Sequence, residues 1–209
     1  MRAQAISPSL LVEQIADRIA EQPATDRVRV ALDGAPAAAP DRLADDLVAP
    51  LRLRGRAVLR VSARDFLRPA SVRLEFGRTD PDAFHDDWLD TSALIREVLA
   101  PLAPDGTGRA LPSLWDASTD RASRADYVHL SPGAVLLLDG PLLLGRGLPF
   151  DLSVHLWLSP AALARRTPPA EAWTLPAYAR YEEETEPVHT ADIVVRVDDP
   201  RRPALVDRP

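Results

Sequence analysis

The residues with the clearest chemical signal lie between positions 34 and 42, where the chain reads GAPAAAPDR. They follow a short apolar run, residues 28–33, and precede a stretch with helical spacing, so we expect a strand, a turn and a helix in that order. A phosphate-binding loop occupies such a position and has the form G-x-x-x-x-G-K-[ST]. Its backbone N–H groups and lysine hold phosphate, and its hydroxyl holds Mg²⁺. The placement is therefore that of an anion-binding loop.

The individual residues of this loop argue against that chemistry. With Gly34 on the first glycine, Ala39, Pro40 and Asp41 replace the second glycine, the lysine and the hydroxyl residue. An alanine with a positive φ costs about 1 kcal/mol unless the loop takes another path. Asp41 places a carboxylate at a helix N-terminus, where it takes the part of the phosphate. The chain has no lysine, and Arg42 is either a surrogate cation or a solvated helix residue. We expect no tight ATP binding.

Composition sets broader limits. The 209 residues are 46% hydrophobic and 27% charged with a net charge of -6, which is typical of one globular domain over residues 1–209. Without cysteine there is neither a disulfide nor a zinc–thiolate site, and we expect a cytoplasmic protein. The acidic balance argues against nucleic acid as a partner. The longest apolar runs are too short to span a membrane.

The hydrophobic pattern alternates between helices and strands, which predicts an α/β fold. We expect an amphipathic helix over residues 8–22, further helices over 41–54, 88–102 and from 160, strands over 28–33, 56–63, 134–139, 152–158 and 191–197, and mainly loops with at most an edge hairpin over 103–132. These strands predict a doubly wound, five-stranded parallel sheet flanked by helices. Ligands bind such sheets beyond the carboxyl ends of the strands, here near 34–41, 63–68 and 139–145.

Five segments, in this order, resemble the uridine kinase and phosphoribulokinase group of P-loop kinases, in particular its actinobacterial uridine kinase-like members. They read VRVALDG, RAVLRVSARDFLRP, GRTDPDAFHDDWLDTSALIREVLAPL, AVLLLDGPLLL and RYEEETEPVHTADIVV, within residues 26–205. The resemblance implies a P-loop fold with a degenerate phosphate loop. It also implies transfer of the γ-phosphoryl group of ATP or GTP to a nucleoside or sugar hydroxyl.

The resemblance further implies catalytic carboxylates. In the family motif D-x-F an aspartate two residues before the phenylalanine is the general base, but counting back from Phe66 gives Arg64. Asp65 is adjacent and faces the other way if strand geometry persists, so it is either a base after a backbone rotation or a structural residue. Asp139 is either the family's Mg²⁺-side acid or a cap at a strand end, and Asp33 is equally ambiguous.

The remaining site residues also follow from the resemblance, and each has a structural alternative. The acceptor cleft is expected to contain Arg64, Phe66, Phe84, Asp86, Arg180 and Tyr181, and the lid Arg165 and Arg166. The four histidines lack the spacing of metal ligands, and no metal site is expected beyond Asp139.

Two functional hypotheses stand at this point. The leading one is a pseudo-kinase without a resident cofactor, which binds a nucleoside-like small molecule or acts as a scaffold or homo-oligomer. The alternative is an active Mg-ATP-dependent phosphotransferase with rearranged residues.

Overall fold

The protein, described here for residues 2–207 as a computed structural model, is built around a seven-stranded sheet with the order β1-β11-β10-β9-β2-β8-β3. The strands of this sheet are β1 (Arg2–Ala5), β2 (Val28–Asp33), β3 (Val58–Ser62), β8 (Val135–Gly140), β9 (Leu152–Trp157), β10 (Ile193–Arg196) and β11 (Ala204–Asp207). From β3 to β10 all neighbours pair in parallel, whereas β11 pairs antiparallel with both β10 and β1. The sheet is therefore mixed and mostly parallel.

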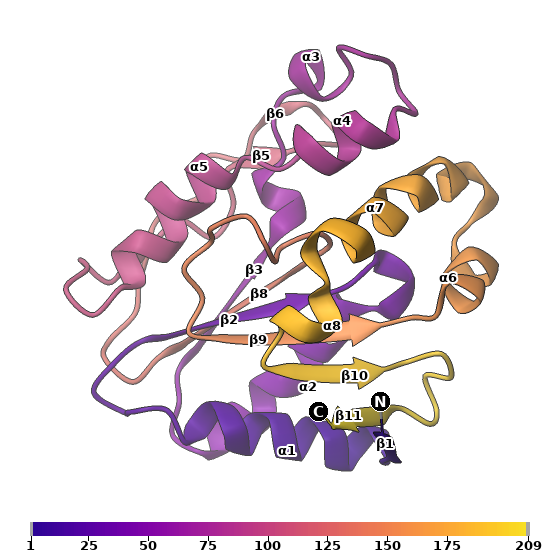
Figure 1. The fold of residues 1–209 in the computed structure, drawn as a ribbon. Coiled ribbons are helices and arrows are strands. Elements are labelled where there is room, and N and C mark those ends of the chain that lie inside the picture. Colours follow the sequence, from indigo (N-terminus) through magenta and orange to yellow (C-terminus); the bar gives the residue numbers. More distant parts are fainter. Residues whose placement is uncertain (1, 208–209) are drawn as a thin grey trace.

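Helices cover both faces of the sheet (Figure 1). The longer helical elements are α1 (Pro8–Ala20), α2 (Pro40–Leu53), α6 (Pro160–Arg166) and α7 (Leu175–Thr185). Shorter turns are η1 (Pro36–Ala38), η2 (Ala63–Phe66), α3 (Ala70–Arg73), α4 (Pro81–Asp86), α5 (Thr91–Leu94), η3 (Ile95–Leu99), η4 (Ala100–Leu102), η5 (Pro169–Thr174) and α8 (Pro187–Thr190). Two separate two-stranded sheets pair β4 (Arg109–Ala110) with β7 (Val128–His129) and β5 (Trp115–Asp116) with β6 (Arg121–Ala122).

Side chains alternate between the two faces of the sheet along β2, so this strand contributes residues to both hydrophobic clusters. Val28, Val30 and Leu32 pack with α1 and α2 in one buried cluster. Ala31 packs on the opposite face in a second cluster, which also holds residues of α5, η3 and α7. Asp33 shares the parity of Ala31 and is fully buried beside α7. The sheet therefore directs an acid at the end of β2 toward the helices that carry the C-terminal motif.

The structure confirms the α/β fold and all five predicted parallel strands, and it adds two strands to this sheet that the sequence pattern did not reveal. β1 and β11 are four residues each and form the antiparallel edge of the sheet. Residues 103–132, expected to form at most an edge hairpin, contain two small antiparallel sheets. The segment after Pro69 contains two short helices, α3 and α4. The helix expected over 88–102 begins only at Thr91 and continues through a π-helical and a 3-10 turn.

The connections at the carboxyl ends of the strands gather on one side of the sheet. The chain leaves β2 toward α2 and β3 on one side, and leaves β9 toward α6, α7 and β10 on the other. Such a divergence opens a crevice between the loops. Within residues 2–207 no helix combines the length and the apolar character needed to cross a membrane.

Candidate functional site

A cavity of about 940 Å³ lies at the carboxyl ends of β2, β3 and β8 and is closed by the segment that follows α6. Its lining draws on three of the segments expected from the sequence. These contribute Ala35, Pro36 and Ala37; Ala63, Arg64, Asp65 and Leu67; and Pro141 and Leu142. The volume lies in the range of pockets that hold small molecules.

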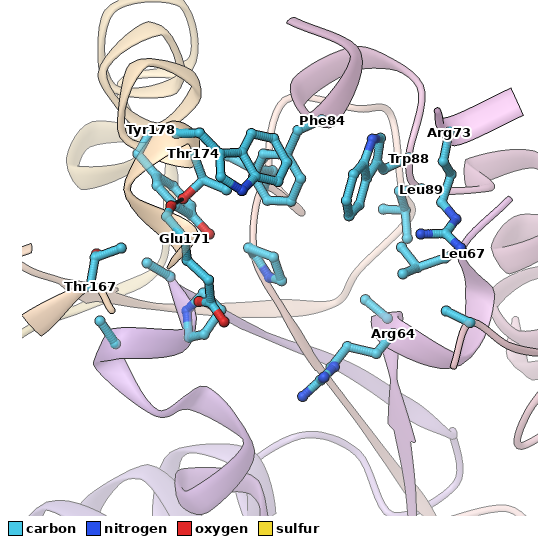
Figure 2. A pocket seen from close by; sticks show the side chains of 18 of the residues that line it. Arg64, Leu67, Arg73, Phe84, Trp88, Leu89, Thr167, Glu171, Thr174 and Tyr178 are labelled. Atoms are coloured by element: carbon cyan, nitrogen blue, oxygen red, sulfur yellow. Dashed lines mark hydrogen bonds between the residues drawn. The ribbon is translucent and has the colours of Figure 1, made fainter. Parts of the chain in front are cut away.

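One wall of the cavity is aromatic (Figure 2). The ring of Phe84 lies 5.2 Å from Trp88, 5.6 Å from Trp173 and 5.9 Å from Tyr178, in edge-to-face contacts. Trp88 and Trp173 are 5.5 Å apart. Arg73 lies over the other face of Trp88, with its guanidinium carbon 5.2 Å from the ring centroid. This aromatic wall joins the segment around α4 to η5 and α7 and offers flat apolar surface to a ligand.

The phosphate-loop segment bonds three of its N–H groups within the protein. The N–H of Gly34 donates to Gly140, the N–H of Ala38 to Ala35 and the N–H of Ala39 to Pro36. Prolines occupy positions 36 and 40 and carry no N–H. A cradle for phosphate needs several free N–H groups that converge on one point. The turn η1 closes on itself instead.

Ala39 adopts the left-handed conformation, with φ 58° and ψ 55°. The loop thus keeps a backbone bend that favours glycine, and the methyl group of Ala39 strains it.

We expect Ala39→Gly to raise the free energy of unfolding by about 0.5 to 1 kcal/mol, because glycine relieves this strain by more than it adds to the entropy of the unfolded chain. Urea denaturation measures the change. The matched control is Ala37→Gly, because Ala37 lies in the same turn but does not have a positive φ. We expect this control to give no increase in the free energy of unfolding. Equal effects of the two substitutions would contradict the assigned strain.

Arg64 and Asp65 both line the cavity, because strand geometry ends at Ser62 and the chain turns into η2. A 3-10 turn rotates successive side chains by about 120°, so the opposed directions of a strand no longer apply. Figure 2 shows Arg64 extending from this turn into the open part of the cavity. The position that holds the base in the resembled family therefore carries a cation, and a carboxylate stands beside it.

Burial raises the pKa of Asp65, and repulsion from Asp139 adds to the shift. A raised pKa means that the folded chain binds this proton more tightly than the unfolded chain. The ionised carboxylate consequently destabilises the fold at pH values above its folded pKa. The penalty disappears below the unfolded value of about 3.9.

We expect Asp65→Asn to be more stable than the parent at pH 7, with the two stabilities converging as the pH falls below about 4. Urea unfolding at several pH values tests this. A variant less stable than the parent at pH 7 would mean that the carboxylate makes a stabilising contact.

Asp139 is buried and bonded within the protein. Its carboxylate accepts from Arg60 at 2.8 Å and from the Ser62 hydroxyl at 3.0 Å, and Arg60 also pairs with Asp45. Both carboxylate oxygens are therefore engaged, one of them by a cation. Among residues 2–207 no group of three or more metal-ligating side chains is assembled. The arrangement favours the structural interpretation of Asp139 over the metal-side one.

Asp33 lies at the centre of a buried hydrogen-bond network. One carboxylate oxygen accepts from the backbone N–H of Leu143 at 2.8 Å, and the other lies 3.1 Å from the Tyr181 hydroxyl and 2.6 Å from Nδ1 of His155. Tyr181 in turn accepts from the N–H of Leu144. The network ties the end of β2 to β9, to α7 and to the segment after β8.

Several residues expected at the site lie elsewhere. Phe66 is fully buried in the core. Arg42 is a solvated helix residue, 82% exposed and 3.9 Å from Asp46. Arg180 pairs with Asp86 at 2.8 Å, with Asp82 and with Glu184. The sequence motifs placed these residues at the site, and the structure corrects that placement. Packing in the core and ion pairs direct their side chains away from the cavity.

The C-terminal and lid residues divide in the same way. Tyr181 belongs to the Asp33 network, and Arg180 holds α7 against α4. Arg165 is exposed at the end of α6, whereas Arg166 lines the cavity and donates to the backbone carbonyl of Val197 at 2.8 Å. Phe84 lies in the aromatic wall, as the acceptor-segment hypothesis expects.

Motif analysis missed the other members of the cavity lining. Trp173, Tyr178, Arg146 and Glu171 lie outside the five quoted segments, and Trp88 lies inside one of them without having been singled out. The only available signal was the presence of two of the four tryptophans in the segments expected to hold the acceptor and the lid.

The loop does not fit Mg-ATP in the manner of a phosphate-binding loop. Its Ala38 and Ala39 N–H groups are bonded internally, Pro40 is buried where a lysine is needed, and exposed Asp41 contributes negative charge. An anion brought against this helix end meets a carboxylate before it meets a cation.

Sheet order, the turn from β2 into α2 and a crevice at the carboxyl edge together define a doubly wound α/β fold. A possible uridine kinase from Bacillus stearothermophilus superposes with a TM-score of 0.71 at 21% identity, over 88% of this chain and 96% of that one. A "putative fructose transport system kinase" from Silicibacter sp. TM1040 superposes with a TM-score of 0.64 at 22% identity, over 86% and 95%. No protein-family model and no curated protein matches the sequence. The chain thus shares the α/β fold of these two structures.

Proposed function

We propose that this protein is a pseudo-kinase: a uridine kinase-like P-loop protein that binds a small molecule in its cavity and has lost tight binding of Mg-ATP. The observation that carries the proposal is the self-bonded loop at residues 34–40, with prolines at positions 36 and 40. The 940 Å³ cavity with its aromatic wall supports retained ligand binding.

Isothermal titration calorimetry tests the proposal directly. Mg-ATP is expected to bind with a Kd of about 1 mM or weaker, which corresponds to roughly -4 kcal/mol or less favourable. A Kd in the low micromolar range would refute the pseudo-kinase. Uridine and related nucleosides, titrated without ATP, report separately on the cavity.

Restoring the family residues should restore affinity. We expect the triple substitution Ala39→Gly, Pro40→Lys and Asp41→Thr to strengthen Mg-ATP binding by about tenfold, because it supplies a cation and removes a carboxylate. Arg52→Lys, at the exposed far end of α2, adds a lysine away from the loop and is the matched control. No gain from the triple variant would mean that the loop follows a different path from that of the family.

One observation favours the alternative of an active phosphotransferase. Asp65 has a raised pKa, lies on the cavity lining and neighbours Arg64, so a proton acceptor and a cation are both present. Phosphoryl transfer to a nucleoside that is abolished by Asp65→Asn would establish this second function.

A further inference from the structure

Arginines outnumber carboxylates in the lining of the cavity, where the acids are Asp65, Asp116 and Glu171. Four arginines line it, namely Arg64, Arg73, Arg146 and Arg166. Arg73 has Asp120 at 3.8 Å. Among the residues that the structure describes, the other three have no carboxylate oxygen within 4.0 Å.

Backbone carbonyls hold two of these three side chains without cancelling their charge. Arg146 donates to the carbonyls of Leu142 and His85, and Arg166 donates to the carbonyl of Val197. A carbonyl fixes the direction of a guanidinium but leaves its full positive charge in place. Burial lowers the pKa of Arg146, and the more distant carboxylates of Asp86 and Asp33 oppose that shift only in part.

The acids of the lining do not offset this charge equally. Asp116 accepts from the hydroxyls of Ser118 and Thr119 and from the Ser118 N–H, so its charge is satisfied within its own turn. Asp65 neighbours Arg64 and Glu171 is exposed. In Figure 2, Arg64 and Glu171 project from opposite walls toward the same open part of the cavity. Arg64 is exposed and makes no hydrogen bond within residues 2–207, so it is available to a ligand.

The aromatic wall lies next to these cations and has an unused donor. The Nε1–H of Trp88 is buried and has no hydrogen-bond partner among the described residues. A buried N–H without a partner costs about 1 to 3 kcal/mol, and a ligand oxygen that reaches it recovers that cost. Flat apolar surface and guanidinium groups without an ion pair therefore line one cavity.

We propose that the cavity binds a small molecule with a planar aromatic ring and an anionic group, with the ring against Trp88 and Phe84 and the anion on Arg64. Guanidinium groups recognise phosphate and carboxylate alike, and aromatic faces accept any planar ring. A nucleoside 5′-monophosphate and an aromatic carboxylate share this chemistry. The inference deepens the proposed function by naming the ligand class, and it does not depend on how Mg-ATP binds.

The test compares acidic and neutral partners of one shape. Uridine 5′-monophosphate is titrated against uridine, and 3-phenylpropionate against 3-phenylpropanol, by calorimetry and by quenching of tryptophan fluorescence. At least one acid is expected to bind about tenfold more tightly than its neutral partner, and less tightly as salt is added. The acid that shows this preference identifies the source of the anion, phosphate or carboxylate.

Substitutions locate the effect. Arg64→Gln is expected to remove most of the preference for the acid, Trp88→Leu to weaken both members of the pair, and Arg52→Gln on exposed α2 to change neither. Thermal unfolding confirms that each variant is folded. Arg64→Gln is the substitution with the smallest effect on folding, because the Arg64 side chain is on the surface. Equal binding of acid and neutral partner, an unchanged preference in Arg64→Gln, or binding of neither acid overturns the proposal. A tight Mg-ATP complex would instead refute only the pseudo-kinase.

Discussion

Phe66→Ala is expected to destabilise the protein by about 3 to 5 kcal/mol, because it removes an aromatic side chain from a packed core and leaves a void. Phe66 is 0% exposed and packs in the cluster that also holds Val61 and Leu94. Urea denaturation monitored by circular dichroism measures the loss. A domain with a typical stability of 5 to 15 kcal/mol is left marginal by such a change.

The chain offers a matched control in Phe76, which is 68% exposed in the turn after α3. Phe76→Ala is expected to change the free energy of unfolding by less than about 0.5 kcal/mol. A Phe66→Ala variant that kept its stability but lost ligand binding would return Phe66 to the cleft, where the motif alone placed it.

Asp33→Ala is expected to cost about 3 to 5 kcal/mol, because it leaves buried donors without an acceptor. The carboxylate is fully buried and accepts from Leu143 and Tyr181 beside the His155 ring. Losing it also frees the segment after β8, so the cavity edge at Leu142 loosens together with the fold. Urea unfolding gives the stability, and hydrogen exchange at Leu143 reports the local opening.

Asp41→Ala is the comparison variant for Asp33→Ala, because Asp41 is an exposed acid at the same end of the sheet as the buried Asp33. Asp41 is exposed in the first turn of α2 and contributes only its interaction with the helix dipole, about 0.5 kcal/mol. Asp33→Asn, which keeps one acceptor oxygen, should fall between the two. Similar small losses for Asp33→Ala and Asp41→Ala would contradict the central role of the Asp33 network.

The sequence by itself determined the elements whose signal is local. The apolar runs at residues 28–33 and 134–139 predict buried parallel strands because both of their faces are covered, and both strands are found there. Pro40 and the absence of lysine mean that the loop has neither a lysine ammonium group nor an N–H at position 40. The sequence alone determines this, because no fold supplies groups that the residues lack. Even the strain at Ala39 follows from a loop that needs a bend at that position.

Tertiary structure alone decided which side chains meet. The edge strands β1 and β11 pair residues some 200 positions apart in the chain, and four residues with little pattern gain their strand character only from that partner. The aromatic wall unites residues of α4 and its flank with η5 and α7. Hydrophobic periodicity reports that a side chain is buried, but it does not report against what.

The side-chain directions of Arg64 and Asp65 also could not be predicted from the sequence pattern. Their order in the chain is plain, yet whether they share a cavity depends on the strand ending at Ser62 and on the 3-10 turn that follows. The residue types therefore determined that the loop holds Pro40 and Asp41 and that the chain has no lysine. The packing of distant segments decided that a cavity with aromatic surface and unpaired arginines stands beside the loop, because contact between such segments is a property of the folded chain and of no local stretch.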